Sequence, residues 1–229
     1  IVSDIEKLKK EKNAVILAHY YVDEDVQDVA DYIGDSFYLS KVATKVSQDR
    51  IIFAGVEFMG ESAKILNPKK RVFMPDMNAD CPMAHMADKD EILALRERYD
   101  DLAVVCYINS TAELKKYSDV CVTSSNAVKI VKNLPNKNIF FIPDRNLGSY
   151  VAKQCPDKNF IFNNGCCPRH VVITKDMVLK AKELHPEARF AAHPECTEDV
   201  LAFADYVGST SGIIDYVVDT DADEYIIGT

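Results

Sequence analysis

Two adjacent cysteines, Cys166 and Cys167, stand out among the residues whose type and spacing could do chemistry. They follow a glycine and precede a proline in NGCCPRHV (164–171), in a chain without any CxxC pair. Adjacent cysteines suit neither a disulfide bond nor a zinc knuckle. Of the two, Cys167 is followed by a proline. So is Cys81, which lies 86 residues earlier (167 − 81 = 86). The spacing therefore indicates that Cys81 and Cys167 are equivalent.

The same interval would place a third cysteine near residue 253 (167 + 86), so we expect the third repeat to be incomplete in this chain. Three small repeats that each deliver one thiolate could hold a 4Fe-4S cluster with one open iron. The alternative is that the seven cysteines, an odd number at irregular spacing, are reduced thiols with structural roles. Spacing alone leaves both interpretations open.

Polar side chains recur where buried strands are expected to end. His19 ends one such strand, and the matching ends carry Tyr107 with Asn109 and His193 with Glu195. Open α/β sheets bind their ligands at the carboxyl ends of the strands. A lone histidine at a strand end is often only a structural group, but the repetition favours a binding site.

Hydroxyl side chains follow three expected strands at points where helices begin. Ser36, Ser124 and Thr210 lie at these turns, where free backbone amides and the helix dipole favour an anion. Each could be a simple helix cap. Three such positions at the ends of repeated strands favour anion binding instead.

The elements that would position these residues alternate between short β-branched runs and helical patterns, which predicts an α/β fold with largely parallel sheets. Capping boxes at Ser3–Glu6 and Ser110–Glu113 mark helix starts, while Gly34 and Asn67-Pro68 mark helix ends. Strands are expected at residues 14–20, 51–56, 71–75, 102–108, 120–123, 138–143, 188–193, 205–208 and 224–227.

An internal repeat organises these elements into three αβα units related by pseudo-threefold symmetry. The second and third repeats keep an offset of 86 residues, whereas the first drifts from 88 (107 − 19) to 68 (144 − 76). We attribute the drift to an extra helix at residues 35–46, capped by Ser36. The expected units are residues 1–82, 83–169 and 170–229, the third of them incomplete.

Composition excludes several classes of function. The chain has 229 residues, 48% of them hydrophobic, which is enough for a substantial core. Its net charge of −9, without a Lys/Arg stripe, argues against nucleic acid as a partner. There is no apolar run of membrane-spanning length, and residues 1–12 are amphipathic and charged rather than a signal peptide. We therefore expect no membrane association and a cytoplasmic location.

The sequence closely resembles the quinolinate synthase family over essentially its whole length. The motifs that carry the resemblance are LAHYY, DVADYIGDSF, GVEFMGESAKILNP, CPMA, YINST, TSSNAV, PDRNLG, GCCPRH, HPEC and DYVGST. The resemblance implies three αβα domains around a 4Fe-4S cluster, with Cys81 and Cys167 as ligands and Cys166 as a neighbour without a role. The family's third cysteine lies in a C-terminal segment that this sequence does not contain. Asn163 and Asn164 replace a tryptophan that many relatives carry near the second ligand.

The resemblance also implies a reaction and its substrates. The family condenses iminoaspartate with dihydroxyacetone phosphate and releases phosphate and water, and L-aspartate oxidase or aspartate dehydrogenase is the expected upstream supplier. Tyr21 and Glu195 are implied as acid-base residues. His85 and His170 follow the two cysteines, and without an identifiable charge partner we expect them to be structural or to support the ligands. The implied substrate-binding residues are His19, Ser36, Tyr107, Asn109, Ser124, His193, Glu195 and Thr210.

Two other functions remain open. A phosphosugar aldolase without a cluster could use the same strand ends, but it requires a Schiff-base lysine, and no lysine lies at any of these ends. A non-catalytic anion-binding module would have the same anion sites without requiring paired proton-transfer groups such as Tyr21 and Glu195.

Overall fold

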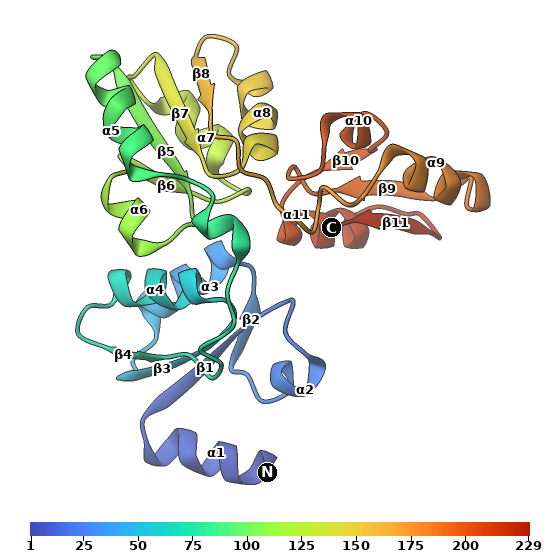
Figure 1. Cartoon of the computed structure of the whole chain (residues 1–229). Helices are drawn as coiled ribbons and strands as arrows, with labels where there is room; N and C mark the ends of the chain where they lie inside the picture. The colour runs from blue at the N-terminus through green and yellow to red at the C-terminus, as the bar shows by residue number, and fades with distance from the viewer. The chain divides into compact units, whose positions relative to one another are not determined.

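The computed structural model describes residues 1–229, which form three parallel β-sheets connected by helices (Figure 1). The strand orders are β2-β1-β3-β4, β6-β5-β7-β8 and β10-β9-β11, and every pairing is parallel. The predicted α/β class with parallel sheets is confirmed. The chain divides into two compact units, Ile1–Cys81 (unit 1) and Pro82–Thr229 (unit 2), each of which is described by itself. The division into three domains stays a prediction.

Each sheet is built from one continuous stretch of the chain. The first contains α1 (Val2–Glu11), β1 (Ala14–His19), α2 (Glu24–Gln27), β2 (Tyr32–Gly34), α3 (Ser36–Lys45), β3 (Arg50–Ala54), α4 (Glu57–Leu66) and β4 (Arg71–Phe73). A short 3-10 helix, η1 (Pro82–His85), follows. The second contains α5 (Lys89–Arg98), β5 (Leu102–Tyr107), α6 (Ala112–Lys116), β6 (Val120–Val122), α7 (Ala127–Asn133), β7 (Asn138–Ile142), α8 (Arg145–Gln154) and β8 (Asn159–Phe162). The third contains α9 (Lys175–Leu184), β9 (Arg189–Ala192), α10 (Glu198–Leu201), β10 (Tyr206–Val207), α11 (Thr210–Asp219) and β11 (Tyr225–Gly228).

The order of elements recurs without an insertion in the first sheet. Strands β1 to β4 begin 88 residues before β5 to β8, as Ala14 and Leu102 show (102 − 14 = 88). The expectation of an extra helix at residues 35–46 is therefore wrong, because α3 corresponds to α7. The apparent drift arose because the segment ending at Asp76 was aligned with the one ending at Asp144, whereas β4 corresponds to β8.

Other local expectations also require correction. Gly34 ends the short strand β2 and not a helix, and neither β2 nor β8 was expected from the sequence. The cap of α3 is Asp35, which accepts a hydrogen bond from the Tyr38 amide at 2.8 Å, so Ser36 is the first helical residue. Helix α1 begins without a side-chain cap, and the cap of α6 is Thr111.

An aspartate at the same place in each sheet fastens the central strand. Its carboxylate accepts a hydrogen bond from an amide of that strand 15 residues earlier and lies within ion-pair distance of a basic side chain from the preceding helix. The amide bonds are Asp31 to Ile16 (2.8 Å), Asp119 to Val104 (2.7 Å) and Asp205 to Phe190 (2.8 Å). The ion pairs are Asp31–Lys9 (2.9 Å), Asp119–Arg96 (2.8 Å) and Asp205–Lys182 (3.5 Å). The recurrence of this contact supports the equivalence of the three sheets.

Helices cover both faces of the second sheet, which carries much of the candidate site. On one face, Ile92 of α5 and Leu114 of α6 pack against Val104, Phe140 and other buried residues (Figure 1). On the other, α8 packs on β7 and β8 through its fully buried side of Leu147, Gly148 and Val151. Burial of this apolar area against a sheet is the dominant stabilising term in such a layered fold. No helix is long and apolar enough to cross a membrane.

Candidate active site and metal-binding residues

A tightly held loop after β8 presents Cys167. Its amide donates a hydrogen bond to Asp144 Oδ2 at 2.8 Å, and its carbonyl accepts from the amides of His170 (3.2 Å) and Val171 (3.1 Å). Gly165 lies so close to the chain before α8 that a Cβ atom there would be 2.5 Å from the Pro143 carbonyl oxygen. Only glycine fits without displacing that backbone, which explains the glycine two residues before the cysteine.

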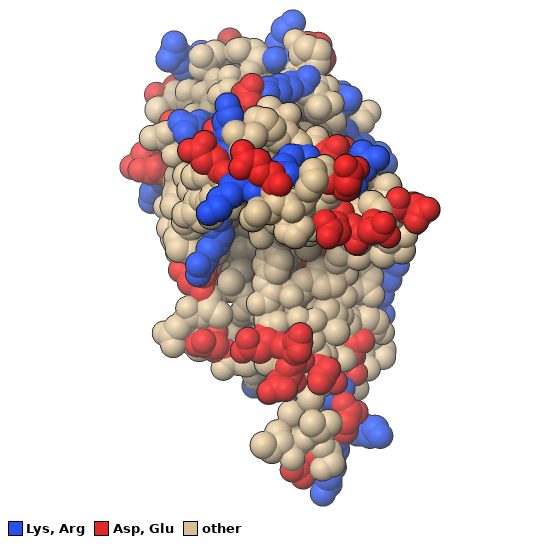
Figure 2. Space-filling view, turned by 90° about the vertical axis from the view of Figure 1, so that its right-hand side faces the viewer, with Lys and Arg blue, Asp and Glu red and all other residues tan.

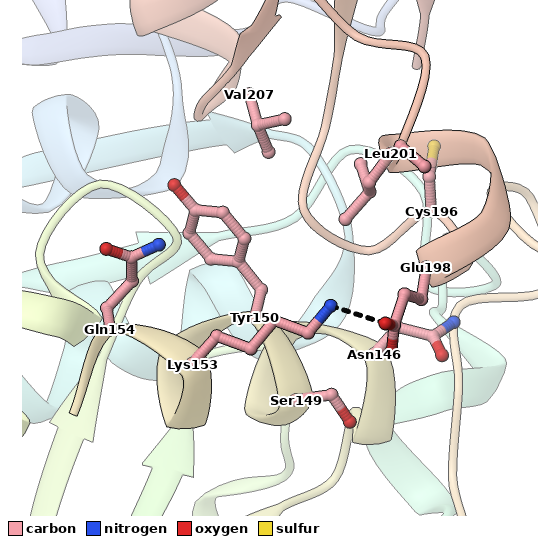
Figure 3. Close-up of a pocket in the computed structure, with 10 residues that line it drawn as sticks. Asn146, Ser149, Tyr150, Lys153, Gln154, Cys196, Glu198, Leu201 and Val207 are labelled. Atoms are coloured by element: carbon pink, nitrogen blue, oxygen red, sulfur yellow. Dashed lines mark ion pairs between the residues drawn. The ribbon is translucent and has the colours of Figure 1, made fainter. Parts of the chain in front are cut away.

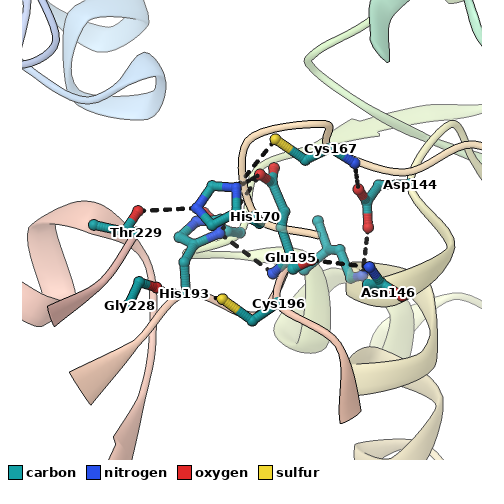
Figure 4. A network of polar contacts seen from close by, with 11 residues as sticks. Asp144, Asn146, Cys167, His170, His193, Glu195, Cys196, Gly228 and Thr229 are labelled. Carbon is teal, nitrogen blue, oxygen red and sulfur yellow. Dashed lines mark hydrogen bonds and ion pairs between the residues drawn. The ribbon is translucent and has the colours of Figure 1, made fainter. Parts of the chain in front are cut away.

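Cys167, His170 and Glu195 form a buried group that could hold a metal ion. His170 Nδ1 is 3.0 Å from Cys167 Sγ and 2.8 Å from Glu195 Oε2, and one potential ligand atom from each residue lies within 4.8 Å of the others. The other ring nitrogen of His170 is 3.0 Å from Thr229 Oγ1. A thiolate, an imidazole and a carboxylate are a donor set for transition metals. The charge partner of His170 that the sequence did not reveal is Glu195 (Figure 4).

Glu195 is the buried carboxylate at the centre of this network. It is 3% exposed, and its Oε1 atom accepts no hydrogen bond from the protein. Burial by itself would raise the pKa of Glu195, but the hydrogen bond from His170 and the nearby imidazoles of His193 and His170 lower it below its usual range. Burial and the charge of Glu195 raise the pKa of Tyr107 well above its usual value. Glu195 is therefore an ionised carboxylate with one oxygen open to a partner, beside a neutral phenol.

His193 lies beside this carboxylate and is held as a neutral imidazole. The Glu195 amide donates to His193 Nδ1 at 3.3 Å, so the proton is on Nε2, which is 3.1 Å from Ser124 Oγ. The ring stacks on His170 with centroids 4.9 Å apart. Burial lowers the pKa of His193 to about 4, although the negative charge of Glu195 opposes the shift. The structure thus brings three predicted residues, Ser124, His193 and Glu195, into one chain of contacts.

The other residues predicted in unit 2 lie at the starts or ends of elements. Tyr107 ends β5 and is 5% exposed, and Asn109 is half-buried in the turn that follows. Thr210 is the first residue of α11, after its cap Ser209, which accepts a hydrogen bond from the Gly212 amide at 3.2 Å. These residues lie where strands end or helices begin, and their part in substrate binding stays a prediction.

In unit 1, His19 and Tyr21 form a local pair. The Tyr21 amide donates to His19 Nδ1 at 3.2 Å, and the two rings meet edge to face with centroids 4.7 Å apart. Burial lowers the pKa of His19 to about 4 against the charge of Asp35, so this imidazole is also neutral. Tyr21 is 61% exposed. The pair presents a neutral imidazole and an accessible phenol at the end of β1.

Ser36 and Cys81 complete the predicted residues of unit 1. Ser36 begins α3, and Cys81 is half-buried, with its amide donating to Asp80 Oδ1 at 2.7 Å. The loop before each cysteine is attached in the same way, because Glu57 N donates to Ala79 O and Arg145 N donates to Gly165 O, both at 2.8 Å. This shared contact supports the predicted equivalence of Cys81 and Cys167.

Comparison with known proteins settles the family. The family described as "NadA: Quinolinate synthetase A protein" matches residues 3–229. The chain belongs to the quinolinate synthase family. It is 61% identical to the quinolinate synthase of Fusobacterium nucleatum over 225 residues, which are 98% of this chain and 75% of that protein. It is 53% identical to that of Caldicellulosiruptor saccharolyticus over 229 residues (100% and 76%) and 50% identical to that of Clostridioides difficile over 225 residues (98% and 74%).

The structure adds residues to this candidate site that sequence reasoning missed. Asp144 is fully buried and bonded to the Cys167 amide, and Asn146 Nδ2 donates to the Glu195 carbonyl at 3.0 Å. Cys196 is also buried, and its thiol donates to the Gly228 carbonyl at 3.3 Å. The signal for the first two was present in the motif PDRNLG, which carried the family resemblance but received no role.

A side pocket adjoins this network between α8 and α10. Its volume is about 340 Å³, and Lys153 and Glu198 on its wall pair at 2.6 Å (Figure 3). Asn146 and Cys196 line it and also belong to the Glu195 network. The full lining is Asn146, Ser149, Tyr150, Lys153, Gln154, Cys196, Glu198, Leu201, Ala202 and Val207.

Proposed function

We propose that this chain catalyses the quinolinate synthase reaction, the condensation of iminoaspartate with dihydroxyacetone phosphate to quinolinate with loss of phosphate and water. Membership of the family supports the reaction. The single structural observation that favours catalysis is the buried carboxylate of Glu195, whose Oε1 accepts no hydrogen bond from the protein. Buried polar atoms are almost always paired, so this oxygen is suited to accept a hydrogen bond or a proton from a bound substrate.

Glu195 is the proposed general base of this reaction. Its free oxygen can accept a proton from the triose, while His170 holds the other oxygen at 2.8 Å and thereby fixes the orientation of the carboxylate. Tyr107 and His193 are neutral hydrogen-bonding groups beside it. Tyr21, the accessible phenol of unit 1, is the proposed acid-base partner.

The remaining predicted residues are proposed to bind the substrates, which carry two carboxylates and one phosphoryl group. Hydroxyl groups and unpaired amides at the starts of helices are suited to such anions. The proposed substrate-binding residues are His19, Ser36, Tyr107, Asn109, Ser124, His193 and Thr210, together with Glu195.

The donor set around Cys167 could hold a metal, and we propose that the chain takes part in binding a 4Fe-4S cluster with Cys81 and Cys167 as ligands. The buried thiol of Cys167, fixed through its own backbone, fits a thiolate ligand of such a cluster. The chemistry that an open iron would supply is Lewis acidity toward a carboxylate or hydroxyl of the substrate. The upstream supplier of iminoaspartate is proposed to be L-aspartate oxidase or aspartate dehydrogenase, and a cytoplasmic location stays a prediction.

The test is quinolinate formation from both substrates by the anaerobically purified full-length protein. Glu195→Gln should keep the metal content and substrate affinity but lower turnover by about 100-fold or more, because the amide cannot accept the proton. Glu198→Gln, an exposed carboxylate three residues later, is the matched control and should be active. A normal rate in Glu195→Gln would show that Glu195 does not act as the base.

Two further measurements on the same protein separate the rival functions. In a phosphosugar aldolase, borohydride would trap dihydroxyacetone phosphate on a lysine of the enzyme. A binding module would retain the substrates without turnover.

A further inference from the structure

The first turn of α8 touches both the candidate metal ligand and the candidate base. Asp144, the cap of this helix, accepts from the Leu147 amide through Oδ1 at 2.6 Å and from the Cys167 amide through Oδ2 at 2.8 Å. Two residues later, Asn146 Nδ2 donates to the Glu195 carbonyl at 3.0 Å (Figure 4). One short segment thus reaches a loop that follows β8 and another that follows β9.

We propose that Asp144 and Asn146 are positioning residues, which fix the Cys167 thiol and the Glu195 carboxylate relative to each other through the rigid start of α8. The proposal rests on the function proposed above and assigns it two further residues. Helix α8 is a firm support, because Leu147 and Val151 are completely buried against the sheet. The Glu195 backbone is held on both sides, since its amide donates to His193 and its carbonyl accepts from Asn146.

The equivalent part of unit 1 shows that these side chains are not required to build this piece of the fold. Val56 corresponds to Asp144 (144 − 56 = 88), and α4 begins there without a side-chain cap. The attachment of the loop nevertheless recurs, from Glu57 N to Ala79 O, and the Cys81 amide donates to Asp80 instead. Phe58 corresponds to Asn146 (146 − 58 = 88) and is a buried core residue. The polar pair is therefore an addition to the fold at the place where Glu195 and Cys167 meet.

A purely structural role makes a different prediction from a positioning role. A structural carboxylate would contribute stability alone, as Asp119 does by accepting from the Val104 amide at 2.7 Å in the same unit. A positioning residue would change turnover, metal retention or thiol access in protein that remains folded. The experiment therefore compares Asn146→Ala and Asp144→Asn with Asp119→Asn.

In the full-length protein, Asn146→Ala should lower kcat about tenfold with KM changed less than about threefold and iron content retained, because the base moves while substrate contacts remain. Asp144→Asn should lose iron faster to a chelator, because the amide can no longer accept both N–H groups. Asp119→Asn should lower the melting temperature but leave kcat and iron retention unchanged.

If no quinolinate forms, that outcome would contradict the proposed function and not the positioning role. A measurement that does not depend on activity then still tests the proposal. In metal-free protein, alkylation of Cys167 by iodoacetamide, followed by mass spectrometry, should accelerate in Asp144→Asn and not in Asp119→Asn. If Asp144→Asn fails to fold, Asn146→Ala and Asn146→Ser provide the test, because kcat should fall while KM changes little. If the variants at both positions behaved like Asp119→Asn, with only the melting temperature lowered, the proposal would be overturned.

Discussion

At the scale of single residues, the network of unit 2 gathers several groups that could ionise around the buried carboxylate of Glu195. Burial and the charge of Glu195 raise the pKa values of Asp144 and Cys167, and they raise that of Cys196 to about 12. Like charges in a dry site disfavour one another, so Glu195, which His170 stabilises, ionises more readily than its neighbours. A cationic metal centre beside these groups would favour a thiolate at Cys167.

Mutation should distinguish the roles of the two adjacent cysteines. Cys167 is buried against His170, whereas Cys166 is partly exposed. Cys167→Ser should abolish iron binding in the full-length protein, because a hydroxyl is a poor ligand for iron in a sulfur cluster. Cys166→Ala should retain iron and activity. Iron and sulfide analysis with visible absorption measures both, and the opposite result would show that the assigned register of the ligand loop is wrong.

At the scale of elements, the hydrogen bond that joins an aspartate to each central strand recurs in all three sheets. The carboxylate lies just before an edge strand and reaches across to the strand beside it. Because a charged acceptor bonded to a backbone amide is worth more than a neutral one, this contact also helps to fix the register between the two strands.

Replacement of the fastening aspartates should lower stability and spare the chemistry. Asp31→Asn and Asp205→Asn should each reduce the free energy of unfolding by about 1–3 kcal/mol, since the strand amide loses a charged acceptor. Thermal unfolding monitored by circular dichroism gives the change, and kcat per bound iron should stay constant at 25 °C. A variant as stable as the parent protein would show that the amide finds another acceptor.

The sequence predicts the long buried strands well, because β5 and β7 are continuous apolar runs. It does not reveal β2, a three-residue strand in which Tyr32 and Ile33 are exposed, because so short a run shows no periodicity. Strand-end positions reveal Glu195 and His193. The contact of Asn146 with Glu195 joins residues 49 positions apart, and no spacing rule within one repeat predicts a bond between two sheets.

At the scale of the whole molecule, net charge sets the conditions under which anionic substrates bind. The chain carries −9, and on the face shown in Figure 2 acidic and basic side chains are interspersed rather than gathered into one basic patch. The long-range field of such a protein repels dianions. Capture must therefore rely on short-range hydrogen bonds at strand ends and helix starts, which salt screens much less.

Stability should fall in mild acid because His19 is kept neutral. Its pKa is about 4 in the folded chain against about 6.5 when unfolded, so between these values the unfolded chain binds the extra proton. The free energy of unfolding should therefore decrease by about 2–3 kcal/mol as pH falls from 6.5 to 4. His19→Gln should remove that part of the loss. Urea titrations at pH 7 and pH 4.5 measure it, and equal losses in both proteins would rule out His19 as the cause.

The continuity of each sheet along the chain has a consequence for biosynthesis. Every strand pairs with partners from its own stretch, so the first and second sheets can form on the ribosome before the third has been translated. Glu195 belongs to the last stretch, while Tyr107, Ser124 and Asn146 belong to the one before it. We therefore expect nascent chains to acquire protease-resistant sheets early and the Glu195 network last, when β9 docks beside an already folded neighbour.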